Sequence, residues 1–227
     1  MLRRRLMLGL GSVLVVFGAG ALVAPNALAD SDIYTPISVD VRGTTHIGSG
    51  VNANAALGPA TMTAQFGVIY GGIQDGVLPL PATSVQFNAL GVVPVRATVS
   101  FIGAAPITGS LVSADVNTVS VNASYYVKLS NVQAKALVGW VPLFVGNDCR
   151  TAQPVQLHLQ TPAGQSYDLN TGGTITGKYT IGQFQNCAPL RLPDLFGVGS
   201  VPVNALIPGS NNTISLDLTN FQFLPTS

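Results

Sequence analysis

Alternating apolar and polar residues recur along most of the chain. In VPVRATVSF, residues 93–101, every second position is apolar, and the positions between hold proline, arginine, threonine and serine. The segment VSVNASYYVKLS, residues 119–130, has the same period of two. Successive side chains of a strand point to opposite faces. The pattern therefore predicts strands with one buried and one solvated face, which is typical of antiparallel sheets.

Shorter stretches with the same alternation predict further strands at 37–41, 62–68, 85–89, 175–181 and 214–218. Glycine and proline residues lie between these stretches at short intervals and predict turns. No window has the period of an amphipathic helix, and only residues 190–209 lack a strand pattern, so that an irregular segment with at most a turn or two of helix is expected there. The chain is predicted to be all-β, an antiparallel β-sandwich, with barrel-like closure as an open alternative.

The N-terminal residues have the order of an export signal. Basic residues at Arg3 to Arg5 precede an apolar run from Leu6 to Val23, and Ala27-Leu28-Ala29 follows. Residues 1–29 are therefore predicted to be a signal peptide that is cleaved after Ala29. Residues 30–227 are expected to form a single β-sandwich domain without a transmembrane anchor. The protein is expected to be secreted, with non-covalent retention at the cell envelope as an open alternative.

Charged residues are scarce, at 8% of the chain. Without Arg3, Arg4 and Arg5, the ten basic residues become seven against nine acidic ones, and 7 − 9 gives a net charge of −2. A nucleic-acid partner requires a basic surface, so this composition excludes that class of partner. Serine, threonine, asparagine and glutamine must supply most of the surface polarity.

Cys149 and Cys187 are the only cysteines. An even pair in an exported chain predicts one disulfide. It would close a loop of 187 − 149 = 38 residues, which the chain-entropy model makes worth about 4 kcal/mol. A zinc site needs more ligands than two histidines and two oxidised cysteines provide, so no metal or other cofactor is predicted.

No arrangement of residues predicts catalysis. With a period of two, His158 points away from the core between two glutamines, and its neighbours include no nucleophile or carboxylate. His46 lies in a glycine-rich stretch that does not match the G-x-S-x-G motif of serine hydrolases. The chain has no glutamate, and no aspartate pair suggests glycoside hydrolysis. The sequence therefore predicts a protein that is not an enzyme.

An uninterrupted apolar run extends from Leu137 to Val145 and contains the only tryptophan. The run is too short to cross a bilayer as a helix. One interpretation is a strand buried on both faces or a loop that plugs the core. The other is an exposed apolar rim or pocket wall that contacts lipid, because tryptophan and phenylalanine suit such interfaces. In that case the contact residues are Leu137, Trp140, Leu143 and Phe144.

Several segments together resemble a set of secreted, uncharacterised proteins from actinobacteria, especially those of the mycobacterial and nocardial kind. They are LGPATMTAQF, LPLPATSVQF, LVGWVPLFVGNDCRTAQPVQLHLQ, GGTITGKYTIGQFQNCAPL and LIPGSNNTISLDL. The resemblance implies export and one β-rich domain with a disulfide between Cys149 and Cys187. It implies no activity and no catalytic residue.

Two functional hypotheses follow. The first is a non-enzymatic structural or interaction protein of the cell envelope, whose partner is an unknown envelope component or lipid. The second is a carrier or binder of an apolar ligand such as an envelope lipid, with residues 137–145 lining or rimming the pocket.

Overall fold

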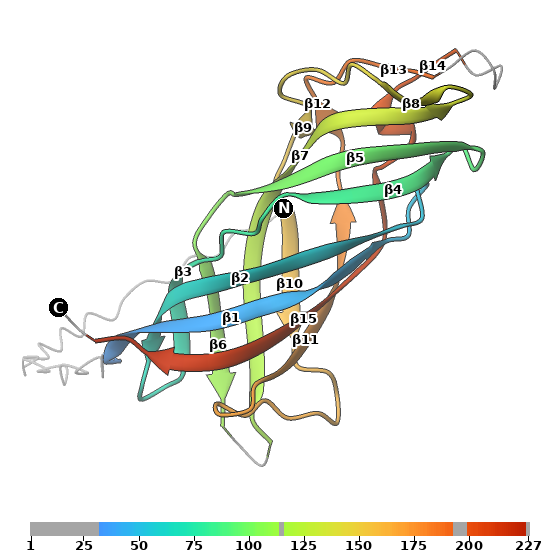
Figure 1. The fold of residues 1–227 in the computed structure, drawn as a ribbon. Coiled ribbons are helices and arrows are strands. Elements are labelled where there is room, and N and C mark those ends of the chain that lie inside the picture. Colours follow the sequence, from blue (N-terminus) through green and yellow to red (C-terminus); the bar gives the residue numbers. More distant parts are fainter. Residues whose placement is uncertain (1–31, 114–115, 193–198, 226–227) are drawn as a thin grey trace, which may run out of the picture. The chain divides into compact units, whose positions relative to one another are not determined.

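A computed structural model describes residues 32–113, 116–192 and 199–225 (Figure 1). The predicted signal peptide, residues 1–29, lies outside the described residues. Residues Asp32–Ser227 make one compact unit. The elements of this unit are β1 (Tyr34–Ile47), β2 (Ala53–Gly67), β3 (Gly72–Val77), β4 (Thr83–Ala89), β5 (Val93–Gly103), β6 (Ile107–Val112), β7 (Thr118–Ala136), β8 (Gly139–Pro142), β9 (Arg150–Thr151), β10 (Val155–Gln160), β11 (Gly173–Ile181), β12 (Phe184–Gln185), β13 (Leu190–Arg191), β14 (Ser200–Val201), the short 3-10 helix η2 (Val203–Ala205) and β15 (Gly209–Phe223).

Thirteen of the strands belong to one antiparallel sheet, in the order β10-β11-β15-β1-β2-β3-β6-β7-β5-β4, with β8, β9 and β12 beside this path. Strand β7 also pairs with β10, so the path from β10 to β7 closes into a ring. The prediction of an all-β antiparallel fold is confirmed. The closure left open by the sequence is present as this ring of strands.

Strand β7 pairs with several different strands along its length. Its first part pairs with β6 and β10, its second part pairs with β5, and its last residues pair with β8. Asn131, with a φ of 48°, lies in the second part, where the register of the β5–β7 pair also shifts. Asparagine tolerates this left-handed conformation better than most residues. The strand can therefore change partners without ending.

The buried side chains form two clusters. The first lies under β4, β5 and the second part of β7, and the second lies between β1, β2, β6, β15 and the first part of β7. The predicted inward residues of 93–99 are all buried, as are Val119, Val121 and Tyr125. Three half-buried side chains, Phe101, Leu157 and Tyr179, pack against both clusters. The junction of the two clusters is therefore inside the ring.

The predicted disulfide is confirmed. Cys149 and Cys187 are bonded, with an S–S distance of 2.02 Å. Cys149 precedes β9 and is fully buried in the first cluster, and Cys187 follows β12 and packs against the same cluster. The bond thus joins two short strands that also pair with each other. Residues 190–209, predicted to be irregular, contain in their described part only β13, β14, η2 and the first residue of β15.

Candidate functional site: an apolar cavity inside the ring of strands

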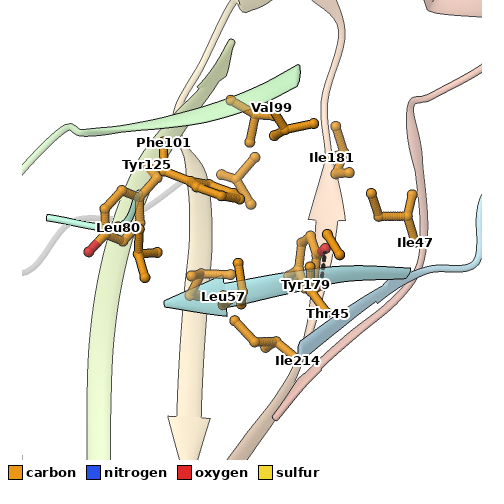
Figure 2. Close-up of a pocket in the computed structure, with 14 residues that line it drawn as sticks. Thr45, Ile47, Leu57, Leu80, Val99, Phe101, Tyr125, Tyr179, Ile181 and Ile214 are labelled. Atoms are coloured by element: carbon orange, nitrogen blue, oxygen red, sulfur yellow. Dashed lines mark hydrogen bonds between the residues drawn. The ribbon is translucent and has the colours of Figure 1, made fainter. Parts of the chain in front are cut away.

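A cavity lies at the junction of the two clusters, and fourteen residues line it (Figure 2). They come from β1, β2, β5, β7, β10, β11 and β15, and from the segment between β3 and β4. Almost all are aliphatic or aromatic, as Leu57, Val99, Phe101 and Ile214 illustrate. The volume of the cavity is about 50 Å³.

A second, smaller cavity of about 30 Å³ adjoins the first. The two share Leu80, Tyr125, Leu157 and Ile214 in their walls, so these side chains form the constriction between them. Protein interiors rarely leave space larger than one water molecule unfilled. An unfilled volume of 50 Å³ costs about 1 kcal/mol of stability relative to a filled core. The pair of cavities is thus a departure from ordinary packing.

The alternation along the strands explains the chemistry of the walls. Each strand directs every second side chain inward, and in the first part of β2 these positions are Ala55 and Leu57. Ala55 is buried and contributes only a methyl group to the wall. This methyl group fills less of the interior than a larger side chain at the same position would.

The wall has one polar pair, Thr45 and Tyr179, whose oxygens are 2.6 Å apart (Figure 2). The Thr45 hydroxyl donates its single hydrogen to the carbonyl oxygen of Thr213 at 2.9 Å. The Tyr179 hydroxyl is therefore the donor to Thr45, and its own lone pairs remain able to accept a hydrogen bond. Burial raises the pKa of Tyr179, so the phenol stays neutral.

Tyr125 is hydrogen-bonded to the segment between β3 and β4. Its hydroxyl donates to the carbonyl oxygen of Leu78 at 3.1 Å, and burial raises its pKa to about 12. Leu80, two residues further on, is half-buried and lines both cavities. Strands β2 and β4 are in contact, although the described pairings include no ladder between them. Leu80 thus contributes to the walls of both cavities from a segment outside the strands.

The four residues predicted to contact an apolar ligand or partner lie elsewhere. The turn between β7 and β8 exposes 85% of Leu137, and Phe144, after β8, is 70% exposed. Trp140 is partly exposed on β8, and Leu143 packs against the first cluster. None of the four lines either cavity. The interpretation of this run as a strand buried on both faces is thus wrong, and its exposed turn agrees with the alternative.

The two histidines lie on the outer surface beside one shallow hollow of about 600 Å³. The Nδ1 atoms of His46 and His158 are 2.9 Å and 2.7 Å from the Oδ1 atoms of Asn54 and Asn122. Since a carboxamide oxygen only accepts, each Nδ1 carries the hydrogen. The pairing of β1 with β15, of β15 with β11 and of β11 with β10 places the two histidines in one row across these four strands. The alternation of residues along each strand could not predict this proximity.

Among the described residues, no three or more histidine, cysteine, aspartate or glutamate side chains gather as a metal site would require. No helix in the same part of the chain has the length and apolar character needed to cross a membrane. Comparisons with protein-family models, with curated proteins and with solved structures find no match.

Proposed function

We propose that this protein is an exported binder or carrier of an apolar ligand, and that the ligand is a slender hydrocarbon chain. The observation that carries the proposal is the apolar cavity at the junction of the two clusters. Ligand pockets in proteins are mostly apolar with few polar groups that fix orientation. The Thr45–Tyr179 pair is the one such group on this wall.

The dimensions favour a chain over a ring system. Volumes of about 50 Å³ and 30 Å³ are well below the roughly 150 Å³ cavity that accepts benzene. They are arranged in succession and share Leu80 and Leu157 in their walls, so a narrow chain would occupy both, but only if the walls expand and these two side chains move aside. A terminal hydroxyl could donate to Tyr179, so we expect a long-chain alcohol to bind more tightly than the matching alkane.

The proposed location outside the cytoplasm is supported by the Cys149–Cys187 disulfide, since such bonds persist in oxidising compartments. It also agrees with the predicted signal peptide. A carrier role requires no chemical step, and we propose that the protein acts without catalysis.

Native mass spectrometry of the protein purified after export, followed by organic extraction, tests the proposal. We expect a bound species of defined stoichiometry that is released by the solvent, or, for protein recovered empty, saturable shifts of cavity methyl signals when decanol is titrated in an NMR experiment. An empty protein whose Leu57, Leu157 and Ile214 methyl signals do not respond to decanol would overturn the proposal.

A second candidate, an interaction protein of the cell envelope, is favoured by a different observation. The apolar turn between β7 and β8 projects from the sheet with no described side chain covering it.

A further inference from the structure

Two exposed apolar turns lie side by side at one end of the sheet. The β4–β5 turn carries Leu90 and Val92, and the β7–β8 turn carries Leu137 and Val138. Strands β5 and β7 pair up to Val95 and Ala134, and continuing that register by three residues places Val92 opposite Leu137. Figure 1 shows both turns pointing the same way.

These turns are among the most exposed apolar parts of the described chain. Leu137 and Val138 have exposed fractions of 85% and 94%, and Leu90 and Val92 are about half exposed. Scattered surface leucines need no explanation, but adjacent ones on two neighbouring turns form a patch that points to an interaction.

Cations lie directly behind the apolar tips. The guanidinium carbon of Arg96 is 4.5 Å, and the Nζ atom of Lys135 5.6 Å, from the ring centroid of Trp140. Gln133 accepts two hydrogen bonds from Arg96, at 2.9 Å and 2.6 Å. In the described part of the chain, neither cation is paired with a carboxylate. Both charges therefore remain available to an anionic partner.

We propose that this end of the sheet docks on a lipid bilayer that carries anionic head groups. Its docking face consists of Leu90, Val92, Arg96, Lys135, Leu137, Val138 and Trp140. Lys135 precedes Leu137 by two residues and Trp140 follows Val138 by two, so each lies about 7 Å behind the tips at the rise of a strand. On docking, the apolar tips would lie deepest, in the hydrocarbon, and the tryptophan and lysine behind them would lie at the interface, near the phosphates.

Charge argues against a second copy of the chain as the occupant. A two-fold contact through the docking face would set Arg96 and Lys135 of one copy against the same cations of the other. Anionic lipids instead attract each cation. The docking face does not include the cavity, so the proposal stands independently of the proposed ligand.

Trp140 is the only tryptophan in the chain, so its fluorescence reports on the docking face alone. The protein is mixed with vesicles of phosphatidylcholine, or of phosphatidylcholine and phosphatidylglycerol in equal parts, and bound protein is separated by flotation. We expect binding and a blue shift of the emission with the anionic vesicles, and weaker binding at high salt.

Substitutions test the cationic residues and the apolar residues of the docking face separately. Lys135→Gln and Arg96→Gln should each weaken binding about fivefold, and the double variant Leu137→Asn/Val138→Asn roughly tenfold or more. The matched control is Val68→Asn/Ile69→Asn in the exposed β2–β3 turn, where the Asp32 carboxylate accepts from the Ile69 and Tyr70 backbone N–H groups at 2.9 Å and 3.3 Å. This control should bind like the wild type.

Equal binding of the Leu137→Asn/Val138→Asn variant and the wild type would overturn the proposal, as would absence of flotation with an unchanged Trp140 emission. A concentration-dependent dimer that shifts the Trp140 emission without vesicles would overturn it in favour of self-association.

Discussion

At the scale of single residues, Ala55 has the smallest side chain of the cavity wall. It is buried and lines the wall from β2. We expect Ala55→Val to fill the cavity, to abolish the NMR response to decanol, and to raise the free energy of unfolding by about 0.5–2 kcal/mol, as cavity-filling substitutions do. Urea denaturation and the decanol titration measure the two effects.

The matched control is Ala134→Val. Ala134 is fully buried in the first cluster but does not line the cavity, so the same added atoms must displace packed neighbours. That substitution should lower the free energy of unfolding by about 1–3 kcal/mol and leave decanol binding in place. If both alanine substitutions destabilise the protein equally, the space beside Ala55 is not available to a side chain or ligand.

A buried tyrosine makes stability depend on alkaline pH. Burial raises the pKa of Tyr125 to about 12 in the folded protein, whereas the unfolded chain loses this proton near pH 10. The stabilising contribution is therefore complete below pH 10 and is lost as the pH rises towards 12. Burial also raises the pKa values of Tyr167 and Tyr179, which adds to the same trend.

We expect the urea midpoint to fall steeply above pH 10, and Tyr125→Phe to make that fall shallower. At neutral pH the variant should lose about 0.5–1.5 kcal/mol, because the hydrogen bond to Leu78 is gone. Parallel pH profiles for the two proteins would contradict the assignment of the effect to Tyr125.

At the scale of elements, we expect the segment between β3 and β4 to control access to the cavities. Leu80 lines both of them, and the Tyr125 hydroxyl donates a hydrogen bond to the carbonyl oxygen of Leu78 in the same segment. Leu80→Ala should therefore speed the exchange of decanol in NMR line-shape measurements. Val77→Ala, an exposed position of β3 that lines neither cavity, should leave the exchange rate unchanged. A Leu80→Ala protein with wild-type exchange would mean that the ligand enters by another route.

Strands with clear alternation, such as β5 and β7, could be predicted from the sequence, because side-chain period is a local property. Short strands such as β3 and β6 were not predicted, and neither were the partners of any strand. The ring depends on the pairing of β7 with β10, and strands that are about 30 residues apart carry no local signal of their pairing. No strand was predicted at Ala55 and Leu57, and only the packed structure shows that these residues line a cavity.

The turn between β7 and β8 was ambiguous for a different reason. A continuous apolar run predicts burial, and here the run contains Gly139, whose φ of 129° allows a tight turn that exposes its neighbours. The sequence predicts a contact role for the tryptophan, but it could not show that Arg96, which comes from a different strand, lies over its ring.

At the scale of the whole unit, three long strands belong to both clusters. β1 contributes Val39 to the second cluster and Ile47 to the first, β2 contributes Ala55 to the first and Met62 to the second, and β7 also serves both. Neither cluster can lose these strands without exposing the other. We therefore expect one cooperative unfolding transition, with coincident curves from Trp140 fluorescence and far-UV circular dichroism.

Removal of the disulfide tests this cooperativity, because both cysteines belong to the first cluster. The variant Cys149→Ala/Cys187→Ala should lose about 4 kcal/mol, since the bond closes a loop of 38 residues. If the clusters unfold together, the single transition moves to lower urea concentration and amide hydrogen exchange quickens in β1 and β15 as much as in β9 and β12. Faster exchange confined to β9, β12 and their neighbours would instead mean that the first cluster unfolds separately, and that the shared strands do not couple it to the second.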